Sequence, residues 1–131
     1  MGNTYKAITN DVKVIVESFY QDSASYPDSM HYVFAYRITI ENHSEHTIKL
    51  LRRHWYIIDG DGAKSEVEGE GVIGQQPILE PEQIHQYVSG CNLHTEIGKM
   101  FGTYLMEKIS DGTTFYVEIP EFLMVAPYRY N

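Results

Sequence analysis

The sequence predicts an all-β fold, an antiparallel sandwich of two sheets with about seven strands. Three observations support this prediction. Several short runs alternate apolar and polar residues with a period of two, turn residues separate these runs at close spacing, and no segment has the periodicity of a helix. Many short strands with frequent turns are typical of a sandwich, because each strand buries one face against the opposite sheet.

The first half of the chain supplies the clearest strands. Residues 11–20 place Val12, Val14 and Val16 on one face, and residues 31–42 alternate over a longer stretch. A period of two held over so many residues cannot be the face of a helix. The segment 47–59 has large apolar groups on both faces, with Trp55 on one and Tyr56 on the other. We therefore expect a central strand that is covered on both sides.

The second half continues the pattern. Asp59-Gly60-Asp61-Gly62 predicts a tight hairpin turn, since both Asp-Gly steps tolerate positive φ, and residues 63–67 form a short return strand. Further strands are expected at 83–89, 99–108 and 114–119, where Pro120 ends the last one, with irregular chain at 90–97. A tryptophan on a central strand is typical of immunoglobulin-like sandwiches. Because Cys91 is the single cysteine, a fibronectin type III-like sandwich fits better.

The length and the net charge of the chain limit the classes of function that it can have. The chain has 131 residues, which fits one domain over 1–131, and its net charge is −8, from 10 basic and 18 acidic residues. An acidic domain repels a phosphate backbone, so we expect no nucleic-acid partner. The first ten residues lack an apolar signal core, and no apolar run approaches the roughly 20 residues that span a membrane. We expect a soluble cytoplasmic protein.

The stretch 66–77 contains three glycines in a G-x-G-x-x-G pattern, at Gly69, Gly71 and Gly74. A dinucleotide site needs a helix that opens at the third glycine, because the helix N-terminus supplies the pyrophosphate donors. Here Gly74 is followed by Gln75, Gln76 and a proline, glutamates surround the first two glycines, and no lysine follows. The dinucleotide interpretation is therefore rejected. Two interpretations remain, an anion-binding nest of backbone N–H groups and, favoured, a crossover between sheets whose glycines take positive φ or allow close packing.

Metal and catalytic motifs are weak throughout. A calcium loop counted from Asp59 fails at its fifth and sixth positions, which are Ala63 and Lys64. Cys91 and His94 have a ligand-like spacing without enough further ligands for zinc. His54 lies in mid-strand, either in a polar core contact or in a surface patch. We expect no cofactor, no resident metal and no catalytic residue.

Six blocks of sequence resemble the ApaG family, and together they cover nearly the whole chain. They are residues 34–42, 50–60, 66–77, 87–90, 98–104 and 115–122. The resemblance implies a fibronectin type III-like β-sandwich and a small cytoplasmic bacterial protein that is linked genetically to cobalt tolerance and magnesium efflux. The same domain occurs in eukaryotic F-box and polymerase-interacting proteins as a protein-binding module, and no enzymatic activity accompanies it. This chain departs from the family pattern at Glu82 and Cys91, neither of which carries known chemistry in the family.

The function expected from these observations is a non-enzymatic binding module that acts through a protein partner in divalent-cation (Co²⁺/Mg²⁺) homeostasis. The alternative is a binder of phosphate, nucleotide or a divalent ion at the glycine-rich loop, with at most weak Mg²⁺, Co²⁺ or phosphate contact. An enzyme acting on nucleotides ranks last. Edge strands also leave room for a homodimer. The candidate binding residues are Gly69, Gly71, Gly74, Gln75, Gln76, Arg53 and His54.

Overall fold

The computed structural model describes residues 3–127 and contains nine strands and two short 3-10 helices within that range. The helices, Asp22–Ala24 and Pro27–Ser29, lie between β2 and β3. The strands are β1 (Thr4–Thr9), β2 (Val12–Tyr20), β3 (Tyr32–Asn42), β4 (Ile48–Asp59), β5 (Lys64–Glu70), β6 (Ile78–Leu79), β7 (Ile84–Leu93), β8 (Ile97–Lys108) and β9 (Thr114–Val125).

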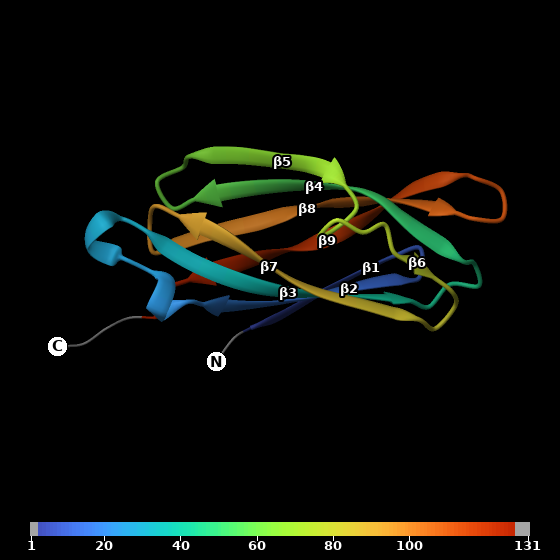
Figure 1. Cartoon of the computed structure of the whole chain (residues 1–131), viewed down its shortest axis with the longest axis horizontal. Helices are drawn as coiled ribbons and strands as arrows, with labels where there is room; N and C mark the ends of the chain where they lie inside the picture. Colours follow the sequence, from blue (N-terminus) through green and yellow to red (C-terminus); the bar gives the residue numbers. More distant parts are fainter. Residues whose placement is uncertain (1–2, 128–131) are drawn as a thin grey trace.

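The strands form two antiparallel sheets that pack face to face (Figure 1). One sheet has the order β1-β2-β3-β7, and the other has the order β5-β4-β8-β9 with the short β6 paired to β4. This arrangement confirms the predicted antiparallel sandwich. Because β3 pairs with β7 and β4 pairs with β8, strands far apart in sequence, the fold depends on long-range pairing as well as on local hairpins.

The core lies between the sheets and is built from the inward residues of the alternating strands. Val12, Val14 and Val16 have no exposed surface, as the period of two predicts. Trp55 is buried at the centre, where its ring meets Tyr36 edge-on at 5.5 Å and Phe122 at 6.0 Å. These edge-to-face contacts join the two sheets, since Tyr36 comes from β3 and Trp55 from β4.

Several predicted boundaries are wrong. β1 and β6 were not expected, and the segment predicted as irregular after residue 89 continues β7 to Leu93. β9 also passes through Pro120 and ends at Val125. The register between β8 and β9 shifts next to this proline, between Met100 and Gly102, and β9 is the last strand of its sheet. A proline is tolerated at such an edge because its missing N–H removes no central ladder bond.

Two further expectations about β4 and the glycine-rich loop are corrected. β4 is central in its sheet, but only one of its faces is covered, since Arg52 on the outer face is exposed. The glycine-rich loop does not cross between sheets. It leads from β5 to β6, which both pair with β4, and the crossing to β7 follows at residues 80–83.

Candidate functional site

An opening with inward polar groups lies between the edge strands β5 and β7. A cavity of about 380 Å³ is found there, closed at one end by residues 72–74 of the glycine-rich loop. Its inward-facing lining includes Tyr36, Arg53, Trp55, Tyr87, Ser89 and Cys91. A concave site of this size with a few polar groups on an apolar wall has the general form of a binding pocket.

The glycine-rich loop folds as a tight turn over this cavity. Val72 and Gln75 exchange two backbone hydrogen bonds, at 2.7 and 3.0 Å, and enclose Ile73 and Gly74, with φ of 47° and 72°. Two positive φ angles in succession define a type I′ turn, which normally takes Asn-Gly. Ile73 is therefore a β-branched residue in the left-handed region, which is sterically costly, and its side chain is 61% exposed.

The first two glycines of the motif serve close packing. At Gly71, φ is 60°, and a Cβ would lie 2.0 Å from the carbonyl oxygen of Gln75. At Gly69 a Cβ would lie 2.8 Å from Nη1 of Arg53, so the missing side chain lets the guanidinium lie against the strand. The expectation that these glycines take positive φ or allow close approach is thus confirmed for Gly69, Gly71 and Gly74.

Arg53 points inward from β4 and holds the loop. Its Nη1 donates to the carbonyl oxygens of Glu70 and Gly71, both at 3.0 Å, and Gln76 Nε2 donates to the carbonyl of Leu51 at 2.9 Å. Within residues 3–127, no carboxylate forms an ion pair with Arg53. A guanidinium with five donors keeps some of them free for a further acceptor in the cavity.

The backbone of the loop offers little to an anion. The N–H groups of Gly71, Val72 and Gln75 already donate to carbonyls of the protein, and no helix begins after Gly74. A nest needs successive free N–H groups that converge on one point. Arg53 is therefore the main anion-attracting group at this site.

Phenol groups line the floor of the cavity. The hydroxyls of Tyr87 and Tyr104 lie 2.5 Å apart, and Tyr104 has no exposed surface. Burial raises the pKa of Tyr36, of Tyr87 and of Tyr104 above the ordinary value of a phenol, so all three are neutral near pH 7. Tyr36 and Tyr87 line the cavity and offer hydroxyl groups to a bound molecule without adding negative charge, whereas Tyr104 is fully buried and hydrogen-bonds to Tyr87.

Cys91 lines the same cavity. The thiol is 8% exposed, and burial, followed by the charge of Asp59, raises its pKa to about 11. It is therefore protonated near neutral pH, whereas a nucleophile or metal ligand is a thiolate. His94, its predicted neighbour in a ligand-like spacing, donates its backbone N–H to Asp59 at 2.7 Å.

The Asp59–Asp61 turn is a hairpin turn, as predicted. Asp59 accepts hydrogen bonds from the backbone N–H groups of Gly60, His94 and Thr95 and from the Thr95 hydroxyl. Burial opposes its ionisation, but these hydrogen bonds together lower the pKa of the carboxyl below its ordinary value. Asp61 accepts from the N–H of Ala63 at 2.9 Å.

Two of the seven predicted binding residues, Arg53 and Gly74, line the cavity, four others lie nearby on β5 or the turn that follows it, and His54 lies apart. Gly69, Gly71, Gly74, Gln75 and Gln76 lie on β5 or its turn, and Arg53 reaches them from β4. His54 lies on the outer face of the same sheet, because consecutive strand residues point to opposite sides. It lies in a surface patch between two glutamates of β5.

Sequence reasoning missed two features of the cavity. The first is the edge position of β7: the strand was predicted at 83–89, but not its place at the edge of the sheet beside the cavity. Its ten residues contain no Asp, Glu, Lys, Arg or Pro, a signal that the sequence already carries. The second is the strained Ile73, which follows from the pairing of Val72 with Gln75 and has no local sequence signature.

Comparison with known proteins shows the family to which this chain belongs. A model of the ApaG domain matches residues 22–108. The protein ApaG of Sinorhizobium fredii is 49% identical over 94% of both chains, and that of Paramagnetospirillum magneticum is 45% identical over 95% of both. The chain belongs to the ApaG family.

Solved structures agree with this assignment. The putative ApaA protein from Bordetella pertussis is 41% identical, with a TM-score of 0.87 over 94% of this chain and all of that chain. The C-terminal domain of wzt is 8% identical with a TM-score of 0.54, which indicates the shared sandwich fold alone. In the part of the ApaG chain described here, residues 3–127, no helix is long and apolar enough to cross a membrane.

Proposed function

We propose that this chain is a non-enzymatic binding module that captures an extended segment of a partner protein along the open side between β5 and β7. The observation that carries the proposal is Ile73. An exposed β-branched residue held at positive φ costs stability, and such strain persists where the surrounding structure and a function maintain it. Ile73 lies at the rim of the cavity, where it would contact whatever enters.

The edge strand β7 supports the same site. Edge strands are normally protected by charges or proline, as β5 is by its lysine and three glutamates, whereas β7 has neither and exposes Val88 at 58%. An added strand would hydrogen-bond to the free edge of β7 and place alternate side chains toward the cavity. Arg53 would then meet an acceptor of the bound segment.

The proposed test places a photo-cross-linking amino acid at residue 88 in the full chain, inside cells of the source organism. The expected result is one specific cross-linked partner, lost with Ile73→Asn. Asn suits the left-handed position, so this variant should fold at least as well as the parent while losing the apolar contact. The matched control is the cross-linker at Ile8, which is 67% exposed on β1, an edge strand of the same sheet. Equal cross-linking at both positions would contradict the proposal.

We also propose that the module acts in divalent-cation homeostasis, the role that membership of the family implies. Cells lacking the chain would then lose Co²⁺ tolerance, and wild-type protein would restore it. Val88→Lys adds a charge to the proposed docking edge without disturbing a buried residue, so it should fail to restore tolerance. Full restoration of Co²⁺ tolerance by Val88→Lys would show that the role in cation homeostasis does not require docking at β7.

A second candidate function is the binding of a small anion, such as phosphate, in the same cavity. It is favoured by one observation, the inward guanidinium of Arg53 without a carboxylate partner among residues 3–127. Titration with inorganic phosphate and pyrophosphate, followed by NMR, should shift the signals of Arg53 and Tyr87. Absence of any shift at millimolar concentrations would exclude this candidate and leave the protein-binding proposal intact.

A further inference from the structure

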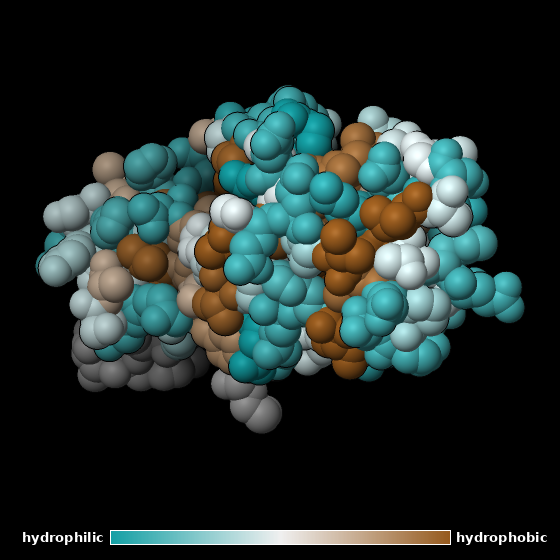
Figure 2. All heavy atoms as spheres, turned by 45° about the vertical axis from the view of Figure 1, so that its right-hand side comes forward, coloured by the Kyte–Doolittle hydropathy of each residue, from teal (hydrophilic) through white to brown (hydrophobic). Residues whose placement is uncertain are grey.

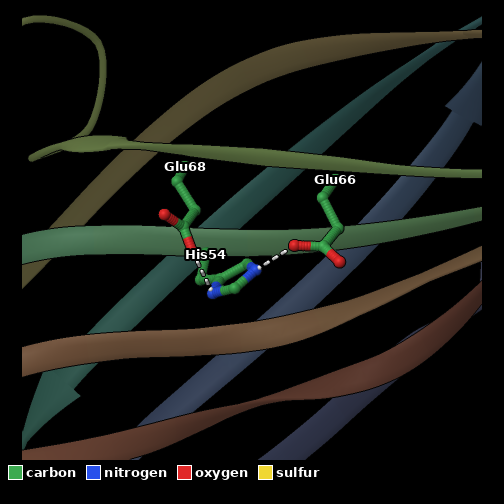
Figure 3. Close-up of side chains that lie close together, drawn as sticks. All are labelled: His54, Glu66 and Glu68. Carbon is green, nitrogen blue, oxygen red and sulfur yellow. Dashed lines mark hydrogen bonds and ion pairs between the residues drawn. The ribbon is translucent and has the colours of Figure 1, made fainter.

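His54 lies on the outer face of the β5-β4-β8-β9 sheet, on the opposite side from the cavity. Strand pairing places Glu68 directly across from His54 and Glu66 across from Tyr56. Figure 3 shows the imidazole between the two carboxylates, with one dashed contact from each ring nitrogen. The Nε2 atom lies 2.9 Å from Glu66 Oε2, and Nδ1 lies 2.8 Å from Glu68 Oε1.

The imidazole ring stacks on a neighbouring aromatic ring, whereas the two carboxylates are more exposed to solvent. The ring of His54 stacks on Tyr56 at 4.5 Å, and Tyr56 stacks on Phe101 at 5.2 Å. The His54 side chain is 27% exposed, against 61% for Glu66 and 53% for Glu68. An incoming ion would therefore meet a stacked imidazole beside two solvent-exposed carboxylates.

One ligand atom from each of the three residues can be chosen so that all lie within 4.8 Å of one another. A carboxylate accepts hydrogen bonds only, so both contacts of the ring are satisfied when both nitrogens carry a proton. A metal ion can replace one of these protons. The remaining N–H then keeps its carboxylate, which is the carboxylate–histidine–metal arrangement that orients metal-binding imidazoles.

We propose that His54, Glu66 and Glu68 form a binding site for a divalent transition-metal ion. His54 Nε2 and the Glu66 carboxylate ligate the ion, Glu68 accepts the Nδ1 proton, and water completes the coordination. A site with an imidazole nitrogen favours Zn²⁺, Ni²⁺ or Cu²⁺, and Mg²⁺ prefers oxygen ligands alone. The site does not rest on the proposed docking edge, since it lies on the other face of the sheet.

The chain contains a matched control. His43 also lies between two glutamates, with Nε2 2.8 Å from Glu41 and Nδ1 3.3 Å from Glu82. Among the described residues, however, this trio does not bring its ligand atoms within the same reach of one another. His43→Gln and His54→Gln thus remove the same side chain from similar charged surroundings, and only the second removes a proposed ligand.

The test titrates the full chain with Ni²⁺ and with Zn²⁺, by calorimetry and by NMR of the histidine ring nitrogens. The expected result is one site that His54→Gln and Glu66→Gln each weaken at least tenfold, that Glu68→Gln weakens less, and that His43→Gln leaves unchanged. Ni²⁺ should broaden the Nε2 signal of His54 more than its Nδ1 signal.

Three outcomes would overturn the site. They are equal weakening by His43→Gln and His54→Gln, unchanged affinity in His54→Gln, and displacement of Ni²⁺ by equimolar Mg²⁺. Val88→Lys separates this test from the proposed function, because that variant should lose the partner and keep full metal affinity.

Discussion

At the scale of single residues, Asp59 connects the β4–β5 hairpin to the turn between β7 and β8. Its carboxylate accepts from three backbone N–H groups and one hydroxyl, all within residues 60 and 94–95. The donors come from segments about 35 residues apart in the sequence, so one side chain fixes two loops at the same end of the sandwich. A carboxylate suits this position because it only accepts.

Asp59→Asn should lower the free energy of unfolding at pH 7 by about 1–3 kcal/mol, since an amide cannot accept from all four donors. The pKa of Asp59 is lowered in the folded protein, so its stabilisation is present above the unfolded value of 3.8 and is lost as the pH falls further. Urea unfolding at pH 7 and at pH 3 measures both effects. The difference between variant and parent should shrink at pH 3; an equal difference at both pH values would contradict this account.

Cys91 should react slowly with thiol reagents in the native protein. Burial raises its pKa to about 11 and leaves little of the sulfur accessible, so only local opening exposes a reactive thiolate. The reaction with a chromogenic disulfide at pH 8 should be complete in seconds in 6 M guanidinium and at least a hundredfold slower without it. A rapid native reaction would show that the cavity between β5 and β7 opens freely.

At the scale of elements, the turn after β5 contains two glycines of one motif that are needed for different structural reasons. Both Gly71 and Gly74 have positive φ, but only Gly71 is enclosed, whereas a side chain at Gly74 would meet nothing within 4 Å. Gly71→Ala should therefore lower the free energy of unfolding by several kcal/mol, and Gly74→Ala by about 1 kcal/mol, the cost of the backbone conformation alone. Chemical denaturation of both variants measures the difference. Similar losses would mean that backbone strain, not packing, decides the turn.

The same elements show how much of the fold and of the site can be predicted from the sequence. Alternation alone located β2, β3, β4 and β8, because burying one face of a strand requires it. β1 was missed since its half-buried face, Tyr5, Ala7 and Thr9, is only weakly apolar, and its large apolar residue Ile8 is exposed. At the candidate site, the glycine motif predicted the turn after β5. The cavity could not be predicted in this way, because it depends on the relative position of β5 and β7, which are far apart in sequence. The period of two already placed Arg53 and His54 on opposite faces of the strand. Their adjacency in sequence was therefore no reason to assign both residues to one binding site.

At the scale of the whole molecule, the two sides of the sandwich differ. On one side β1 lies against β9, and the backbone N–H of Glu118 donates to the Thr9 hydroxyl at 3.1 Å. On the other side β5 and β7 leave the cavity between them. Figure 2 shows that, on the face seen there, apolar atoms gather in several groups set among hydrophilic ones rather than in one continuous patch. The open side is distinguished by its edge strand β7 and by the inward polar groups of the cavity.

The buried tyrosines at this cavity make the free energy of unfolding decrease at alkaline pH. Burial raises the pKa of Tyr36, Tyr87 and Tyr104 above the unfolded value of 10.0, so the folded protein keeps their protons when the unfolded chain loses them. The stability is complete below pH 10 and falls as the pH rises above it, by about 1.4 kcal/mol per pH unit for each phenol that stays protonated. Urea midpoints measured between pH 9 and 11.5 should decline accordingly.

Tyr87→Phe isolates one of these phenols. The variant loses a hydrogen bond to Tyr104 and should be less stable at pH 8, but its decline above pH 10 should be shallower than that of the parent. Tyr116→Phe is the matched control, because Tyr116 is 66% exposed on β9 and should leave both the stability and the slope unchanged. If Tyr87→Phe kept the parental slope, the alkaline loss would come from other groups, and the cavity floor would not control the pH response of the fold.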